Sequence, residues 1–501
     1  MEIAVVKGDI LNTSAELIVV GLYMEENWEN DFVLSLNECV GGKLKKKAQA
    51  TDFNGKLGES LFFAAGPETS SDYVLVVGLG AQNELNASSI RQITGSVFST
   101  ASRLRVKTVA LELLGEDNDE VDAKINGRAI AEALLLARYE FNAYKETKKT
   151  IQVNAVTIVA EDGRDARKAE RGVEEAVTVI DGVTVARDLV NTPAQDMNPE
   201  RLAESAEQIA KLSNGRVKTR VYDREWCAKK KMGSFLAVAQ GADTDPKFIH
   251  LIYKPTGKPK GKVALVGKGV TFDSGGLSLK PGKSMETMKC DMAGAAAVLG
   301  VFATLARTTP RVEVHGIIPA TENMINGKAI RPGDVVRAMN GKTIEILNTD
   351  AEGRLILADA LGYAAKLDPD YTIDLATLTG ACVVALGEEI SSLTANDDEF
   401  AQSLLAASST AGEEMWQMPL YAPYRKLLES DIADVRNIST SRYGGSMTAA
   451  LFLNEFVEDG MVWAHMDIAG PAFAERPIGS FLGKGGTGYG VRTLTAWLAT
   501  L

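Results

Sequence analysis

The chain has 501 residues, of which 45% are hydrophobic and 24% are charged, and this composition excludes a disordered or fibrous protein. The formal net charge of -12 weakens sequence-independent attraction to nucleic-acid backbones and to anionic lipid, so neither nucleic acid nor a membrane is an expected partner. One hydrophobic core rarely organises a chain of this length, and we therefore expect two domains.

The first domain is expected at residues 1–163, where β-rich runs alternate with helical stretches at the spacing of βαβ units. The expected strands are Leu17–Val20, Tyr73–Val77, Thr108–Leu111 and Val153–Val159, and the expected helices are Ala87–Leu104 and Ile125–Tyr139. This pattern predicts a small α/β domain built on a parallel sheet.

A linker helix is expected at residues 164–190, because apolar residues such as Val173, Ile180 and Val190 recur there at helical spacing. Pro193 and Pro199 would end it. A second α/β domain is expected at residues 191–501, with strands at Phe248–Tyr253, Val263–Val266, Val312–Ile318 and Tyr371–Leu375. Ligands bind outside the carboxyl ends of strands in open α/β sheets, so the loops after these strands are candidate sites.

The four cysteines form no C-x-x-C pair, which fits a reducing compartment. The N-terminus has no basic stretch followed by a long apolar one, and we expect a cytoplasmic protein.

Only three histidines occur and none forms H-E-x-x-H, which excludes a histidine-rich zinc site. The serine-hydrolase pattern G-x-S-x-G is also absent.

Two segments concentrate carboxylates in expected loops. The first runs from Leu265 through Phe272-Asp-Ser-Gly-Gly to Asp291, and the second reads Asn348-Thr-Asp-Ala-Glu-Gly-Arg-Leu. Asp350 and Glu352 would leave the same face of an extended stretch, where a divalent cation such as Mg²⁺, Mn²⁺ or Zn²⁺ could neutralise them. On spacing alone, an acidic surface turn and a helix N-cap at Asp291 explain the same residues.

The second segment resembles, letter for letter, the signature of the leucyl aminopeptidases, also called cytosol aminopeptidases, of peptidase family M17. The stretch from Lys268 to Asp291 also matches in identity and spacing, as do Asp374-Leu-Ala-Thr-Leu-Thr-Gly-Ala and His465-Met-Asp-Ile-Ala-Gly. The resemblance implies a macro-domain-like N-terminal domain. It also implies a catalytic α/β domain with a mixed central sheet and helices on both faces.

The resemblance also implies roles for individual residues. Two divalent metal ions, Mn²⁺ or Zn²⁺, would be held by Lys268, Asp273, Asp291, Asp350 and Glu352, with Lys280 and Arg354 as the catalytic pair. The first side chain of the substrate would lie among Met288, Thr377, Gly380, Ala469 and Ala472, which suit Leu, Met and other apolar residues. A lysine ligand must be neutral, and nearby metal charge would lower its pKa accordingly.

The implied reaction is hydrolysis of the N-terminal residue from a peptide with a free N-terminus by a metal-bridging hydroxide. Lys280 would stabilise the oxyanion, and Arg354 would hold a bicarbonate ion as general base. A homohexamer that acts in peptide turnover is also implied. Two alternatives stay open: a DNA-binding or regulatory protein on an aminopeptidase scaffold, and another two-metal hydrolase such as a phosphatase.

Overall fold

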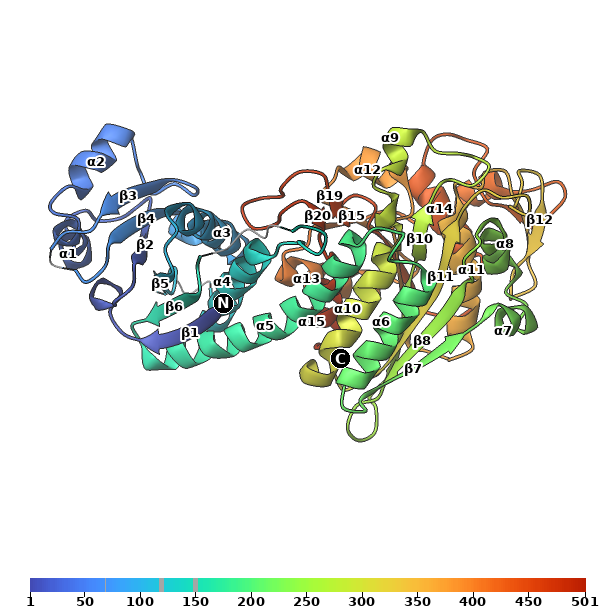
Figure 1. Cartoon of the computed structure of the whole chain (residues 1–501), viewed down its shortest axis with the longest axis horizontal. Coiled ribbons are helices and arrows are strands. Elements are labelled where there is room, and N and C mark those ends of the chain that lie inside the picture. Colours follow the sequence, from blue (N-terminus) through green and yellow to red (C-terminus); the bar gives the residue numbers. More distant parts are fainter. Residues whose placement is uncertain (68, 117–120, 147–151) are drawn as a thin grey trace. The chain divides into compact units, whose positions relative to one another are not determined.

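The structure is a computed structural model, and it describes residues 1–67, 69–116, 121–146 and 152–501. The chain divides into two compact units, which are described separately (Figure 1). The N-terminal unit comprises Met1–Ile180 and Arg476–Gly483, and the C-terminal unit comprises Asp181–Glu475 and Lys484–Leu501.

The N-terminal unit is built on a six-stranded sheet. The strand order is β1 (Glu2–Lys7), β6 (Ala155–Ala160), β5 (Thr108–Glu112), β2 (Leu17–Tyr23), β4 (Tyr73–Gly80), β3 (Ser60–Ala64). Every neighbouring pair is parallel except β3 and β4, so the predicted parallel-sheet domain is confirmed, with one antiparallel edge strand. All residues of the central strand β2 are buried, as both faces of a covered parallel sheet require.

Helices cover both faces of this sheet. On one face, α3 (Ala87–Leu104), α4 (Ala123–Arg138) and the first half of α5 (Gly163–Asn191) bury their apolar side chains. On the other face, α1 (Asp31–Cys39) and α2 (Leu44–Thr51) do the same. Residues 164–190, the expected linker helix, lie within α5, which is one helix of 29 residues.

A nine-stranded mixed sheet organises the C-terminal unit. The strand order is β16 (Met415–Gln417), β15 (Ser391–Ala395), β18 (Trp463–Asp467), β14 (Tyr371–Ala376), β9 (Lys262–Gly267), β11 (Glu313–Asn323), β8 (Lys247–Tyr253), β7 (Val217–Tyr222), and β10 (Gly269–Asp273) pairs with β11. Strands β18, β14, β9 and β11 are parallel, whereas β15 and β8 join them antiparallel. The predicted mixed central sheet is confirmed.

Helices also cover both faces of the second sheet (Figure 1). One face is covered by α6 (Pro199–Leu212) and α10 (Ala293–Thr308), with α15 (Val491–Leu498) packed on α10. The other is covered by α8 (Gly233–Val238), α11 (Glu352–Ala365) and α14 (Gly445–Asn454), which share one apolar core with the sheet. The remaining α-helices and strands of this unit are α7 (Arg224–Lys229), α9 (Gly282–Met285), α12 (Gly380–Leu386), α13 (Asp398–Ala411), β12 (Val335–Arg337), β13 (Thr343–Glu345), β17 (Val435–Arg436), β19 (Phe473–Ala474) and β20 (Gly485–Gly486).

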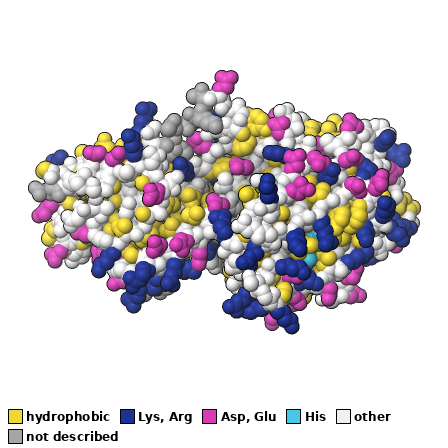
Figure 2. Space-filling model, turned by 60° about the horizontal axis from the view of Figure 1, so that its bottom comes forward, with side chains coloured by type: hydrophobic (Ala, Val, Ile, Leu, Met, Phe, Trp, Pro, Cys, Tyr) yellow, Lys and Arg dark blue, Asp and Glu magenta, His cyan; other side chains and the backbone are white. Residues whose placement is uncertain are grey.

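The stretch Gly282–Thr308 is long and apolar enough to cross a membrane, but 83% of its most apolar window is buried inside the protein. It therefore behaves as a core helix of this unit. On the molecular face shown in Figure 2, acidic and basic side chains are interspersed with apolar ones.

Candidate active site at the carboxyl ends of the strands

The candidate residues gather where parallel strands of the C-terminal sheet end. Lys268 follows β9 directly, Asp273 is the last residue of β10, and Thr377 follows β14. The carboxyl ends of parallel neighbours meet at one edge of a sheet, so residues far apart in the sequence converge there.

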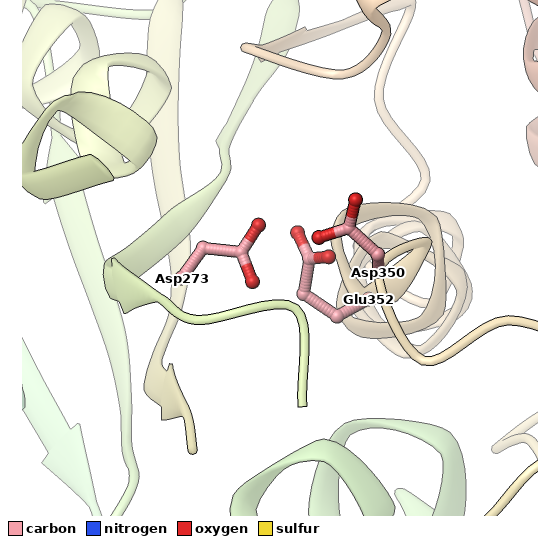
Figure 3. A group of neighbouring side chains, drawn as sticks. All are labelled: Asp273, Asp350 and Glu352. Atoms are coloured by element: carbon pink, nitrogen blue, oxygen red, sulfur yellow. The ribbon is translucent and has the colours of Figure 1, made fainter. Parts of the chain in front are cut away.

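Asp273, Asp350 and Glu352 each place a carboxylate oxygen within 4.8 Å of the others. Figure 3 shows the Asp273 side chain coming from the end of β10 toward Asp350 and Glu352 at the start of α11. These last two do not share the face of an extended stretch. Asp350 lies in a turn and Glu352 is the first residue of α11, so the turn into the helix brings both carboxylates together.

Lys268 and Lys280 connect these three carboxylates with a fourth carboxylate, that of Asp291. The Nζ atom of Lys268 lies 2.6 Å from Asp291 Oδ1 and 2.8 Å from Glu352 Oε1. The Nζ atom of Lys280 lies 2.9 Å from Asp273 Oδ2 and 2.6 Å from Asp350 Oδ1. The structure therefore brings six of the seven expected metal-binding and catalytic residues into one cluster.

Asp291 is not the N-cap of a helix. It lies in a short 3-10 turn, Met288–Met292, and the following helix α10 has Met292 at its N-cap position, without a side-chain cap. Instead, Asp291 Oδ1 accepts hydrogen bonds from Lys268 and from the Thr377 hydroxyl, the latter over 2.7 Å. The side chain thus belongs to the carboxylate cluster.

Two glycines leave room for this close packing. A Cβ atom at Gly353 would lie 2.6 Å from Cε of Lys268, so a side chain there would displace the lysine. Gly275 has a φ of +85°, and a Cβ atom on it would lie 2.9 Å from Asp350 Oδ1. The turn after Asp273 therefore requires glycine for both its conformation and its contacts.

The cluster carries an excess of negative charge in a buried place. Four carboxylates and two ammonium groups give a formal charge of −2. Burial, together with the neighbouring Glu352 carboxylate, raises the pKa of Asp273 to about 6. Burial alone would lower the pKa of Lys268, but the surrounding carboxylates outweigh it and raise that pKa.

Two buried oxygens of the cluster, Asp291 Oδ2 and Glu352 Oε2, have no hydrogen-bond partner among the described residues. Buried polar atoms are nearly always paired, so unpaired oxygens in an acidic cluster point to a cation. Carboxylate oxygens and one amine nitrogen are donors that Mn²⁺ and Zn²⁺ both accept. The residues present therefore fit divalent metal ions.

Arg354 is the seventh expected residue and lies in the first turn of α11. It takes no part in the four ion pairs that join the other six residues. Its Nη1 atom donates to the backbone oxygen of Asn437 over 2.7 Å, and its guanidinium lies 5.9 Å from the ring centre of Phe452. Its buried Nε atom has no hydrogen-bond partner among the described residues. Burial lowers the pKa of Arg354 to about 10, against the opposing effect of Glu352.

The expected pocket residues lie on three segments. Met288 is half-buried in the turn before Asp291, and the backbone oxygen of Thr377 accepts from Lys268 over 2.8 Å. Gly380 is the exposed first residue of α12, whereas Ala469 and Ala472 follow β18. Of these five residues, Thr377 forms hydrogen bonds with the carboxylate cluster, through Lys268 and Asp291.

Sequence reasoning missed three residues that position the site. Asn323, at the end of β11, donates to Asp273, and Asn437 donates from its side chain to the backbone oxygen of Asn348 over 2.6 Å. Asp467, at the end of β18, accepts from the backbone of residues 378, 379 and 469. Asp467 lies in the motif His465-Met-Asp-Ile-Ala-Gly, but no local sequence pattern identifies Asn323 or Asn437 as residues of the site.

The whole chain is similar to known proteins. The catalytic-domain profile of the cytosol aminopeptidase family matches residues 184–495, and the family's N-terminal-domain profile matches residues 19–148. Probable cytosol aminopeptidases of Rippkaea orientalis and Thermosynechococcus vestitus are each 44% identical to the chain. The similarity to the first relative covers 99% of this chain and 99% of the relative, and the similarity to the second covers 100% of each.

Solved structures agree with this assignment. A tomato leucine aminopeptidase variant superposes with a TM-score of 0.91 at 35% identity, covering 100% of this chain and 97% of its own. The bottromycin maturation enzyme BotP in complex with Mn superposes with a TM-score of 0.84 at 35% identity, covering 97% of this chain and 99% of its own. The chain therefore belongs to the cytosol aminopeptidase family and is a metal-dependent exopeptidase of the aminopeptidase type.

Proposed function

We propose that this aminopeptidase removes single apolar residues, preferably Leu or Met, from the N-terminus of peptides with the help of two divalent metal ions, Mn²⁺ or Zn²⁺. The observation that carries the proposal is the convergence of four carboxylates and Lys268, with two buried oxygens unpaired among the described residues. The Mn complex of the related maturation enzyme supports the choice of metal.

The metal ligands would be Lys268, Asp273, Asp291, Asp350 and Glu352. The carboxylates alone raise the pKa of Lys268, and the charge of bound dications opposes this effect, so the amine can act as a neutral ligand. When bound, two such ions activate a water molecule as the nucleophile, polarise the scissile carbonyl and bind the free α-amine of the substrate.

Lys280 would stabilise the oxyanion that forms on the scissile carbonyl. Its side chain is 15% exposed, more than the 3% of Lys268, and it lies between Asp273 and Asp350 on the open side of the cluster. An ammonium held in this way needs little reorganisation when negative charge develops next to it.

Arg354 would hold a bicarbonate ion that acts as general base. The buried Nε–H of Arg354 lacks a partner among the described residues, and this side chain lies at the amino end of the 14-residue helix α11. Free backbone N–H groups and the helix dipole favour an anion at such a position. No histidine occurs in either acidic motif, so the role of base is otherwise unfilled.

The pocket for the first side chain would be lined by Met288, Thr377, Gly380, Ala469 and Ala472. Small residues at four of these positions leave space, and the Met288 side chain is apolar and adaptable. Such a pocket separates substrates that differ by one methylene by only about 1 to 3 kcal/mol. Because the pocket would be roomy and apolar, we expect the enzyme to prefer Leu and Met over smaller residues at the N-terminus of the substrate.

We place the protein in the cytoplasm and expect it to work as a homohexamer. The four cysteines are buried and form no C-x-x-C pair in the sequence, which suits a reducing compartment. The relatives named above are described as cytosol aminopeptidases. The hexamer rests on the family resemblance, and sedimentation analysis of the purified protein would test it.

The deciding experiment measures hydrolysis of leucine p-nitroanilide by the purified protein with Mn²⁺. The expected result is nitroaniline release that EDTA abolishes and that Asp350→Ala loses. Asp459→Ala, which removes an exposed carboxylate in the same unit, is the matched control and should keep full activity. A folded, metal-loaded wild-type protein that releases no nitroaniline would show the proposal to be wrong.

A further inference from the structure

The buried carboxylate of Asp467 joins two segments that carry the expected pocket residues. Its side chain is fully buried at the end of β18. Oδ1 accepts hydrogen bonds from the backbone N–H groups of Leu378 at 3.0 Å, Thr379 at 3.4 Å and Ala469 at 3.2 Å. Oδ2 accepts from the Thr379 hydroxyl at 2.7 Å.

These bonds fix the position of one pocket wall relative to the other. In the proposed pocket, residues 377–380 would form the first wall and residues 469–472 the second. The Thr379 hydroxyl also accepts from the backbone N–H of Cys382 at 3.0 Å, so it caps α12, the helix that Gly380 begins. One carboxylate thus sets the distance between the two walls, and through the Thr379 hydroxyl it also fixes the position at which α12 begins.

The first wall also continues into the carboxylate cluster. Thr377, two residues before Thr379, donates from its hydroxyl to Asp291. A shift of the wall would therefore change the place of the substrate side chain relative to the reacting carbonyl. Hydrogen bonds from several N–H groups to one ionised carboxylate are stronger than neutral ones and resist such a shift.

We propose that Asp467 is a specificity-determining positioning residue, which sets the width of the pocket for the first side chain by clamping its two walls together. This inference rests on the proposed aminopeptidase function. Among the described residues, the hydrogen bonds of the Asp467 carboxylate go to Leu378, Thr379 and Ala469, and Asp467 acts through these three residues.

The test compares kcat and KM on leucine and alanine p-nitroanilides for the wild type, Asp467→Asn and Thr379→Val. Thr379→Val removes one bond of the clamp. Asp467→Asn keeps an acceptor for the three N–H groups but replaces the Oδ2 acceptor of the Thr379 hydroxyl proton with an amide N–H₂, which only donates. In both variants we expect KM for the leucine substrate to rise and the Leu/Ala ratio of kcat/KM to fall by roughly ten-fold. Metal content should stay at the wild-type value.

Asp359→Asn is the matched control for the general effect of altering a buried carboxylate. Asp359 is fully buried in the same unit and accepts from the backbone N–H groups of Phe235 and Met339, away from the pocket segments. Its Leu/Ala ratio should equal that of the wild type. Any loss of thermal stability in the Asp467 and Thr379 variants is then separated from their change in selectivity.

The outcomes are distinct. If Asp467→Asn and Thr379→Val fold, bind metal and keep the wild-type Leu/Ala ratio, the clamp is refuted while the aminopeptidase function stands. If the control loses selectivity to the same degree, the effect is one of general stability and the clamp is refuted as well. If the wild type hydrolyses neither substrate, the proposed function itself fails.

Discussion

The side-chain amide of Asn323 donates to Oδ1 of Asp273 over 2.7 Å and to the backbone oxygen of Thr349 over 3.0 Å. One residue at the end of β11 thus holds a proposed metal ligand from β10 and the turn that carries Asp350. Because Asn323 is buried, neither bond competes with solvent.

Asn323→Ala should therefore weaken metal binding by about ten- to a hundred-fold, since groups that orient a ligand typically contribute that much. Chelator competition with Mn²⁺ would measure the change. Asn396→Ala is the control, because Asn396 also links two backbone groups, of Met461 and Trp463. Equal affinities in the two variants would argue against a role of Asn323 in holding Asp273.

Lys280→Ala should lower kcat on leucine p-nitroanilide by about 10² to 10³-fold, which is the typical effect of losing one oxyanion donor. Metal content should remain, because Lys280 is not among the proposed ligands. Lys283→Ala, an exposed lysine three residues later, should leave kcat unchanged. A fall in metal content parallel to the fall in kcat would assign Lys280 to metal binding instead.

Metal ions should raise the thermal-unfolding midpoint of the wild-type protein. A ligand that binds only the folded state contributes about 2.7 kcal/mol at a concentration of 100 times its Kd. Asp291→Asn removes one of the buried carboxylates and should reduce this rise, while Asp459→Asn should preserve it. Calorimetry with and without Mn²⁺ measures both. An undiminished rise in Asp291→Asn would exclude Asp291 as a ligand.

The pair His250 and His315 should make stability depend on pH. Burial, aided by His315 and Arg220, lowers the pKa of His250 from 6.5 to about 3. The unfolded chain therefore binds more protons than the folded one between these two values. The stability contributed by neutral His250 is fully present above pH 6.5 and is lost as the pH falls through this window, by about 2 kcal/mol at pH 5.

His250→Gln should thus lose less stability than the wild type between pH 8 and pH 5, as measured by the thermal-unfolding midpoint. The charged and titratable groups around His250 are His315 at 2.9 Å, Tyr363 at 3.0 Å, Arg220 on β7 and, through His315, Glu313. The comparison at pH 8, where His250 is neutral in both states, is the internal control. Parallel pH curves for the two proteins would contradict the assignment.

Long periodic segments made much of the fold predictable. The expected helix Ala87–Leu104 is α3 residue for residue, and the expected strands Leu17–Val20 and Tyr73–Val77 lie within β2 and β4. Buried parallel strands are nearly continuous apolar runs, which stand out in a sequence. No prediction covered the antiparallel edge strand β3, because its five residues alternate in burial and form too short a pattern to identify.

The site was predictable in part. Carboxylates in loops after strands pointed to a cation, whereas Lys268 as a ligand followed only from the family resemblance. Asn323 and Asp467 were not predicted, since Asn323 donates to Asp273, 50 residues before it, and Asp467 accepts from Leu378, 89 residues before it. Such pairings depend on which segments the fold brings together at the ends of the strands, and no local sequence pattern encodes this.

Residues 476–483 belong to the N-terminal unit, where Ser480 donates from its hydroxyl to the backbone oxygen of Gln92 over 2.6 Å and from its N–H to the Gln92 side chain over 3.0 Å. The part of this unit that is made first, Met1–Ile180, leaves the ribosome long before this segment does. Because N-terminal domains generally fold first during synthesis, the contact between α3 and Ser480 has to wait until most of the C-terminal unit has been translated.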